Sequence, residues 1–338
     1  MRVIQVRPGQ AVLPPESVIC HDVRNPAQRS EVLVRKGTRL GADDLAGILE
    51  RGAAAVDLAI PQAGDIGEDV AAARLGAAVA GVGVRVGSSH FGQVSLTSEL
   101  RGLLRVRRDR LDHANRQSGV LIATSPADWT ADQGATLAVV KCAPLLMPES
   151  VIQAVEAGGA LVEVEAFQPR RVAFVAPGPR LGDSALARAT ASLTRAIEWF
   201  GSSLQPVIRT QLAVGEVASG FRQAAASGVD VILAAGAAAT DPRDVLFDAL
   251  RHAGGRVEQI GIPAEPGTAC WIGALGGRPV LGLASCELFG RPGALDLLLP
   301  RVFVGEPLDG DLLRRIALGG LLAGGPSRIL PYHDTESV

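Results

Sequence analysis

Apolar runs and helical periodicity alternate along residues 169–338. The run at 172–176 predicts a buried strand, and apolar side chains at helical spacing between residues 184 and 200 predict the helix that follows. The same pattern predicts strands at 207–208, 229–233, 256–262, 269–272 and 279–283, and helices at 216–226, 244–253 and, largely, 288–304. Alternating strands and helices are typical of a mostly parallel sheet with helices on both faces. We therefore expect a three-layer α/β/α domain at 169–338.

Residues 1–168 show a different pattern, in which short strands with apolar residues at every second position are mixed with a few helices. Strands are expected at 17–23, 30–34, 56–60, 93–97, 103–106, 120–124 and 136–141, and helices at 45–50 and 65–80. Asp43 and Asp44 are expected to cap the first of these helices. The mixture predicts a β-rich α+β region that ends near residue 168. The polar residues 331–338 predict a loose tail.

Composition and charge limit the class of protein. The 338 residues are 47% hydrophobic and 4% aromatic, so alanine, valine and leucine must build the cores. The 33 lysines and arginines nearly balance the 35 acidic residues, which gives no electrostatic reason to expect nucleic acid or a membrane as a partner. The first residues lack the apolar core of a signal peptide, and no uncharged apolar run reaches the roughly 20 residues that span a bilayer. The four cysteines lie far apart in sequence, so disulfides and a zinc site are not expected. We expect a soluble cytoplasmic protein.

The loop at 235–244 is the main candidate for a ligand site. It follows the strand at 229–233 and opens a helix, and such loops at the carboxyl ends of strands are where open α/β sheets bind ligands. The N-terminus of that helix would offer N–H groups to an anion. Asp241 is expected to be the N-cap, with Pro242 and Asp244 in the first turn. Helix capping alone would explain one aspartate, whereas a carboxylate here could also hold a Mg²⁺ that bridges phosphates.

Three other loops carry weaker signals. The loop at 177–183 matches neither a P-loop nor a dinucleotide fingerprint, so a plain strand-to-helix turn capped by Asp183 or Ser184 is the favoured interpretation. Glu265-Pro266-Gly267-Thr268 and the segment 282–286 are turn-rich loops at strand ends. Cys286 could be a ligand or a nucleophile, but a structural thiol is favoured because no histidine stands near it in sequence.

These loops together resemble the molybdopterin-binding domain shared by molybdopterin molybdotransferases and molybdopterin adenylyltransferases. The segment AAGAAATDPRDV resembles the family loop Thr-Gly-Gly-x-Ser/Gly-x-x-Pro-x-Asp, and EPGTACWIGALGGRPVLGLASC resembles its Pro-Gly turn, Gly-x-Pro-Val strand and Gly-Leu-Pro-Gly loop. Order and spacing match over about 172–304. CHDV, VRKGTRL, DDLAGIL, GEDVAAARL, GLLRV and VKCAPLLMPES resemble the N-terminal region of a stand-alone, two-part molybdopterin-binding protein related to the molybdotransferases.

The resemblance implies a set of site residues. Asp241 and Asp244 are the catalytic candidates, and Asp244 is also the metal candidate. The candidates for cofactor binding are Gly236, Ala237, Ala239, Asp183, Ser184, Pro266, Gly267, Gly282, Ser285 and Cys286. Pro266 and Gly267 match the family's Pro-Gly turn, and Gly236 matches the first glycine of its loop.

The chain also departs from the family pattern. Ala235 replaces a hydroxyl residue, Ala237 the second glycine, and Ala239 the serine or glycine. Glu265 stands where relatives often carry a basic residue, and Ala284-Ser285 replaces Pro-Gly. Residues 212–215 lack the paired aspartates of relatives that transfer a nucleotide or a metal. A methyl in place of a hydroxyl loses a hydrogen bond to the ligand, and lost carboxylates remove metal ligands.

Three functions remain open on this basis. The first is a molybdopterin-binding protein of molybdenum cofactor biosynthesis, with molybdate insertion into molybdopterin or its nucleotide derivative as the reaction of an active, magnesium-dependent transferase. The second is a non-catalytic binding or assembly module for a molybdoenzyme or another biosynthetic protein. The third is a structural relic that binds nothing. The resemblance also implies a homo-oligomer.

Overall fold

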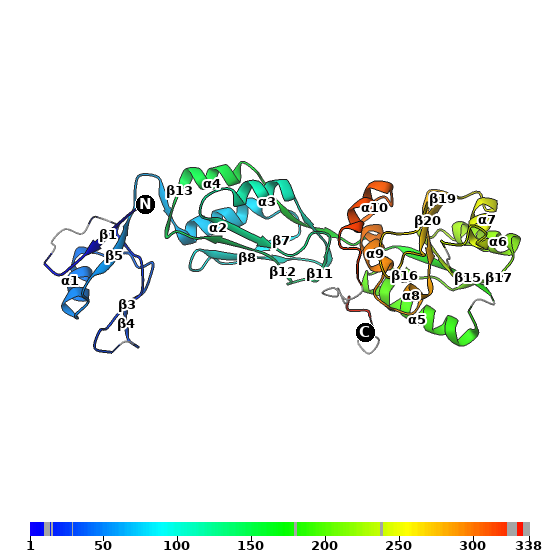
Figure 1. Cartoon of the computed structure of the whole chain (residues 1–338), viewed down its shortest axis with the longest axis horizontal. Coiled ribbons are helices and arrows are strands. Elements are labelled where there is room, and N and C mark those ends of the chain that lie inside the picture. The colour runs from blue at the N-terminus through cyan, green and yellow to red at the C-terminus, as the bar shows by residue number, and fades with distance from the viewer. Residues whose placement is uncertain are drawn as a thin grey trace. The chain divides into compact units, whose positions relative to one another are not determined.

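The chain divides into two compact units, residues 1–166 and 167–338 (Figure 1). The computed structural model describes residues 1–9, 14, 16–28, 30–178, 181–236, 239–322 and 330–333. Ala237 of the candidate loop lies outside these residues. Within the described parts of the chain, no helix is long and apolar enough to cross a membrane. All four cysteines are free thiols.

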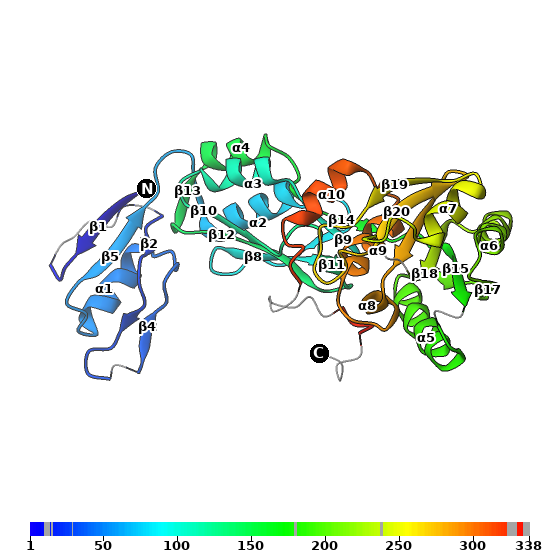
Figure 2. The ribbon, with the colours of Figure 1, turned by 45° about the vertical axis from the view of Figure 1, so that its right-hand side comes forward.

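The second unit is built on a seven-stranded, mostly parallel sheet (Figures 1 and 2). Its strands are β15 (Arg171–Gly178), β16 (Ser203–Leu204), β17 (Ile208–Gln211), β18 (Val231–Ala235), β19 (Arg256–Ile260), β20 (Trp271–Leu275) and β21 (Arg278–Leu283). The order is β16-β15-β18-β21-β20-β19, and β17 also pairs with β15. The pairs formed by β15, β18 and β21 among themselves and with β16 and β17 are parallel, whereas β20 and β19 are antiparallel.

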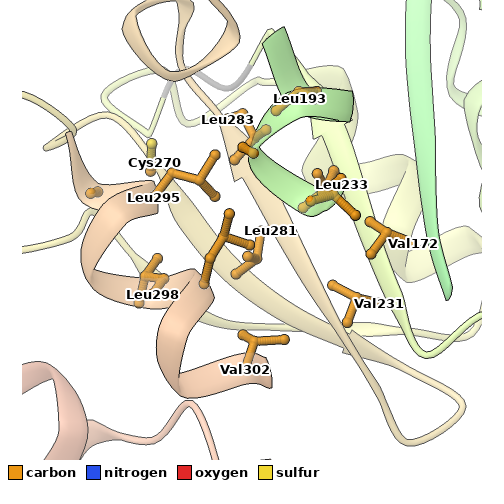
Figure 3. Close-up of a cluster of buried hydrophobic side chains, with 14 of the residues drawn as sticks. Val172, Leu193, Val231, Leu233, Cys270, Leu281, Leu283, Leu295, Leu298 and Val302 are labelled. Carbon is orange, nitrogen blue, oxygen red and sulfur yellow. The ribbon is translucent and has the colours of Figure 1, made fainter. Parts of the chain in front are cut away.

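Helices pack against both faces of this sheet. They are α5 (Asp183–Trp199), α6 (Val214–Ala226), α7 (Val245–His252), α8 (Ser285–Leu288), α9 (Ala294–Val304) and α10 (Gly310–Ala317). Side chains alternate across β15, so that Val172 and Phe174 face α5, α9 and α10, while Ala173 and Val175 face α6 and α7. Figure 3 shows the first of these two cores, where α9 leucines meet Leu281 and Leu283.

The two edges of the sheet differ in kind. β19 lies at one edge and exposes Arg256, Glu258 and Ile260 at alternate positions. At the other edge β15 is covered by the short strands β16 and β17. One edge strand therefore carries two exposed charged side chains, and the opposite edge is covered by strands of only two and four residues.

Residues 330–333 pack against α9 of the second unit. Leu330, Tyr332 and His333 are buried, and Tyr332 Oη donates a 2.6 Å hydrogen bond to Asp296 Oδ1 in α9. His333 Nε2 lies 2.9 Å from the same carboxylate oxygen, and its Nδ1 lies 2.7 Å from the Gly290 carbonyl oxygen. The expectation of a loose tail from residue 331 is therefore wrong for 331–333, because aromatic and carboxylate contacts hold the segment. Residues 334–338 lie outside the described chain.

The first unit contains shorter elements arranged in several small sheets. Its strands are β1 (Arg2–Val6), β2 (Val18–Ile19), β3 (Val23–Arg24), β4 (Val32–Val34), β5 (Val56–Ile60), β6 (Asp65–Gly67), β7 (Val84–Val86), β8 (Gln93–Ser98), β9 (Gly102–Val106), β10 (Val120–Thr124), β11 (Thr130–Ala131), β12 (Thr136–Cys142), β13 (Leu146–Pro148) and β14 (Val162–Ala166). Its helices are α1 (Ala42–Glu50), α2 (Glu68–Val79), α3 (Arg108–Asn115) and α4 (Glu149–Glu156). The largest core of this unit joins α2 and α4 to the four-stranded sheet β10-β12-β8-β7.

Two helix starts in the first unit differ from the expectation. The helix expected at 65–80 begins at Glu68, because Asp65–Gly67 pairs with β13 as a short strand. Asp43 and Asp44 lie inside α1 instead of capping it from outside, and Gly41 is the N-cap. Asp44 Oδ2 nevertheless accepts a 2.9 Å hydrogen bond from the Gly41 N–H, which satisfies one donor at the helix start.

Candidate functional site

Backbone hydrogen bonds join the three candidate loops at the carboxyl ends of β18 and β21. Gly236 ends β18 with φ +84°, a left-handed conformation that favours glycine, and its N–H donates to the Leu283 carbonyl at 3.1 Å. The Ala239 N–H donates to the Ala269 carbonyl at 3.1 Å. The loop after β18 therefore contacts both the segment after the Pro-Gly turn and the end of β21. The sequence alone gives the order of these three loops along the chain but not their contact in space.

Asp244, and not Asp241, is the N-cap of the helix after this loop. Asp244 is the N-cap of α7, is 1% exposed, and accepts a 3.0 Å hydrogen bond from the Leu246 N–H. Asp241 is exposed, and its Oδ1 accepts a 2.9 Å hydrogen bond from the Arg243 N–H within the loop. The prediction that Asp241 caps the helix is thus wrong, because Pro242 and Arg243 lie in a turn ahead of α7. The buried capping position of Asp244 gives it a structural role in the helix.

The Pro-Gly turn packs against α9 and against Glu287 of α8. Gly267 has φ +122°, and a Cβ added to it would lie 2.4 Å from Ala294 Cβ and 2.8 Å from Glu287 Oε1. Glu287 is itself buried, at 3% exposure. Glycine at 267 is therefore required by close packing inside the unit, while Pro266 is partly exposed.

Gly282 makes room for a tryptophan. It pairs with Trp271 across β20 and β21, and a Cβ at 282 would lie 2.1 Å from the indole Nε1. Trp271 is fully buried and packs edge-on against Phe247 of α7, with ring centroids 5.4 Å apart. This packing accounts for Gly282, which the family resemblance assigns to cofactor binding.

Asp183 and Ser184 lie in the exposed first turn of α5, after the loop that follows β15. Asp183 Oδ1 accepts a 2.8 Å hydrogen bond from Arg209 Nη2, in an ion pair with both side chains largely exposed. Ser184 Oγ accepts a 2.9 Å hydrogen bond from Arg188 Nη1, one turn further along the helix. Ala213 is the N-cap of α6 and makes no side-chain cap.

A cavity of about 640 Å³ opens beside Ser285 and Cys286, at the carboxyl end of β21. Its wall on α5 carries Arg188, Ser192 and Arg195, and its opposite wall carries Phe289 and Arg291. Arg188 also stacks over the Phe289 ring, with Cζ 5.8 Å from the ring centroid. Three guanidinium groups around one cavity favour an anionic ligand, because guanidinium forks match the oxygens of phosphates and carboxylates.

The sequence expectation missed these arginines. Arg188, Ser192 and Arg195 stand at i, i+4 and i+7 and therefore share one face of α5. That spacing was a usable signal, but on its own it is equally typical of a solvated helix face. The spacing indicates a ligand site only together with Phe289 and Arg291, which the tertiary fold brings opposite α5.

The Cys286 thiol is protected from ionisation. Burial, a 2.9 Å hydrogen bond from Sγ to Glu287 Oε2, and the charge of Glu287 raise the pKa of Cys286 to about 12. A thiolate is the nucleophilic form of cysteine, so this environment keeps Cys286 as a neutral thiol near pH 7. Among the alternatives for Cys286, the geometry favours the structural thiol over the nucleophile.

The described residues do not fit a Mg²⁺ held by the protein. No cluster of three or more histidine, cysteine, aspartate or glutamate side chains suited to a metal occurs in the described part of the chain. The Oδ1 atom of Asp244 is engaged in capping α7. The donor set at the cavity is cationic instead, and such a set suits an anionic group such as a phosphate or a carboxylate.

Comparisons with known proteins give limited likenesses. No protein-family model matches the chain, and no curated protein matches it. The protein CinA with unknown function from Thermoplasma acidophilum is 14% identical with a TM-score of 0.29, over 35% of this chain and 90% of its own. A molybdopterin biosynthesis protein from Mycobacterium abscessus is 16% identical with a TM-score of 0.28, over 44% and 98%. MogA is 20% identical with a TM-score of 0.27, over 44% and 100%.

Proposed function

We propose that this protein binds molybdopterin, or its nucleotide derivative, and acts in the biosynthesis or delivery of the molybdenum cofactor. The observation that carries the proposal is the cavity lined by Arg188, Arg195 and Arg291 beside Ser285. It opens at the strand end where the loop sequence resembles that of molybdopterin-binding domains. The phosphate of the pterin would bind the arginines, and the Ser285 hydroxyl would donate a further hydrogen bond.

Within this proposal, holding the cofactor is favoured over transferring molybdate. A transferase needs acidic residues that bind a metal and neutralise charge at the transferred group. Here the candidate acid Asp244 is buried as a helix cap, and Ala213 begins α6 where relatives carry acidic residues. A binding or assembly module that passes the cofactor to a molybdoenzyme is therefore the preferred form of the function, and molybdate insertion is the second form.

Calorimetric titration of the full chain with molybdopterin, kept anaerobic, tests the binding site. Arg291→Gln is expected to weaken binding by about tenfold or more, since a hydrogen bond to a charged group contributes about 1.5–3 kcal/mol. The matched control is Arg251→Gln, an exposed arginine of α7 paired with Asp248 outside the cavity. Equal loss in both variants, or loss in neither, would reject the cavity as the site. Turnover with molybdate in the wild type would favour the second form of the function.

Two variants of Asp244 are needed, because a helix-capping carboxylate and a ligand-binding carboxylate respond differently to substitution. Asp244→Asn keeps an N-cap oxygen, whereas Asp244→Ala removes it and is expected to cost about 1 kcal/mol of stability. If the role is structural, Asp244→Asn retains both stability and molybdopterin affinity. Lost affinity in a stable Asp244→Asn variant would show that the carboxylate contacts the ligand or its metal. Urea unfolding and calorimetry on the same samples provide both readouts.

A further inference from the structure

The first unit contains a cavity of about 530 Å³ that the proposed function does not use. The turn after β4, with Arg35 and Lys36, forms one wall of this cavity. The start of α2, with Glu68, and the hairpin tip at His90 and Phe91 form the others. Basic, acidic and aromatic side chains therefore surround one space.

Glu68 is the unusual group in this cavity. It is the first residue of α2 and is 8% exposed, and its Oε2 atom is buried. Within the described part of the chain, Oε2 accepts no hydrogen bond, and its cationic neighbour Lys36 Nζ lies 3.7 Å away, beyond hydrogen-bond distance. Buried carboxylates are normally hydrogen-bonded, because it is costly to desolvate a charged oxygen that accepts no hydrogen bond. A carboxylate left in this state at a cavity wall is suited to receive donors from a ligand.

Two glycines bring the backbone close to that carboxylate. A Cβ at Gly92 would lie 3.0 Å from Glu68 Oε2, and a Cβ at Gly37 would lie 3.5 Å from Oε1. Both glycines also have positive φ, +68° and +83°. The chain thus approaches Glu68 from two sides without placing a side chain against it.

Phe91 lines the same cavity in a backbone conformation that phenylalanine disfavours. It has φ +51° and, with Gly92, forms the two central residues of a tight hairpin whose His90 N–H donates to Gln93 O at 2.9 Å. Asparagine, aspartate or glycine is preferred at such a position. Phe91 is nevertheless 47% exposed, and its ring centroid lies 4.0 Å from that of His90. An exposed aromatic ring held in a strained backbone next to a cavity points to a stacking surface.

We propose that this cavity binds a phosphorylated heterocycle through a 2-amino-4-oxopyrimidine edge, the edge shared by guanine and pterins. This edge presents two adjacent N–H donors, which match the two oxygens of the Glu68 carboxylate. The ring stacks on Phe91, and Lys36, whose side chain is exposed, turns from Glu68 to the phosphate. Carboxylate pairing and aromatic stacking are the usual means of reading such edges in single bases.

The rival explanations are a structural ion pair and a simple amine ligand. A structural pair of Glu68 and Lys36 gives no reason for a strained aromatic at the cavity rim. An amine would satisfy Glu68 alone, but Arg35 and Lys36 line the same space and favour a ligand that also carries negative charge. Neither rival predicts discrimination between two nucleotides that differ by one amino group.

The first test is calorimetric titration of the full chain with GMP, IMP and pterin-6-carboxylate. IMP lacks the 2-amino group, so it is expected to bind at least tenfold more weakly than GMP. Glu68→Gln is expected to weaken GMP binding at least tenfold, whereas Asp109→Asn, an exposed acid in the first turn of α3, leaves it unchanged. Pterin-6-carboxylate offers the same edge with a carboxylate in place of the phosphate, so tighter binding of the pterin than of GMP would identify a pterin as the source of the edge. Equal affinity for GMP and IMP, binding of neither GMP nor the pterin, or an unaffected Glu68→Gln variant would overturn the proposal.

The second test uses Phe91→Asn and remains informative if Glu68→Gln fails to fold. Asparagine suits the turn, so the variant is expected to be at least as stable as the wild type in urea, yet to bind GMP at least fivefold more weakly. A purely structural Phe91 would instead leave GMP affinity unchanged, which would contradict the stacking role. The outcome is independent of molybdopterin binding in the second unit, because both tests use ligands and variants of the first unit.

Discussion

Replacement of Glu287 by glutamine is expected to make the Cys286 thiol more acidic. Burial raises the pKa of Cys286 first, and the hydrogen bond to Glu287 Oε2 and the charge of that carboxylate raise it further, to about 12 against an ordinary value of 9.0. At pH 9 the wild-type thiolate fraction is then ~0.1%, against about half for an unperturbed thiol. Glutamine removes the charge but not the burial, so the pKa of Cys286 should fall without reaching its ordinary value.

The assay is alkylation by iodoacetamide between pH 7 and pH 11, followed by peptide mass spectrometry. A Cys20→Ser background removes the other partly exposed thiol. Glu287→Gln is expected to accelerate alkylation of Cys286 by about tenfold at pH 9, since one pKa unit changes the thiolate fraction tenfold. Glu198→Gln, an exposed acid near the end of α5, serves as the matched control and should leave the profile unchanged.

Superimposed profiles for the wild type and Glu287→Gln would refute this reasoning, because burial alone would then set the acidity of Cys286. The same shift has a consequence for stability. A thiol whose folded pKa lies above its unfolded value stabilises the fold fully below about pH 9. That contribution is lost as pH rises from 9 toward 12, so the free energy of unfolding should fall across this window.

Two further substitutions test the packing around the candidate site. Gly267→Ala should cost about 2–4 kcal/mol in urea unfolding, because its Cβ would meet Ala294 and because φ is positive. Gly277→Ala, at φ +78° with open space around it, is the control and should cost only about 1–2 kcal/mol of stability. Equal losses of stability in the two variants would exclude a clash between residue 267 and Ala294. Tyr332→Phe removes the hydrogen bond to Asp296 and should lower stability by about 1–3 kcal/mol. The variant should also show faster hydrogen exchange at 330–333. Exchange no faster than in the wild type would contradict the role of Tyr332 in anchoring this segment.

Long apolar runs and helical periods predict most elements of the second unit, but they do not predict α10. The single helix expected at 288–304 is instead two helices, α8 and α9, separated at 289–293. Residues 172–176 and 279–283 are apolar on both faces, as a strand between two layers of helices must be. Short elements of the first unit were harder, because two or three residues carry no period. Asp65–Gly67 forms a strand because it pairs with β13. The residue types in this segment are equally compatible with the first turn of the helix that follows.

The candidate site shows a similar limit. Asp241 and Asp244 are both suitable N-caps by residue type, and the backbone path of the intervening turn decides between them. Gly282 resembles a ligand-binding glycine, but its partner Trp271 is known only from the register of two strands. The arginine cavity could not be predicted because its two walls, on α5 and after α8, lie about a hundred residues apart.

The edges of the seven-stranded sheet restrict how this unit can associate with other chains. The exposed positions of β19 carry Arg256 and Glu258 before Ile260, and β16 and β17 cover β15 in short pieces. Charged or interrupted edges resist the addition of a foreign strand. Self-association by strand pairing, the route to fibrils, is therefore disfavoured. Copies of the chain are expected to associate through helices or loops instead. The strand ends beside the arginine cavity then take part in no continuous sheet between molecules.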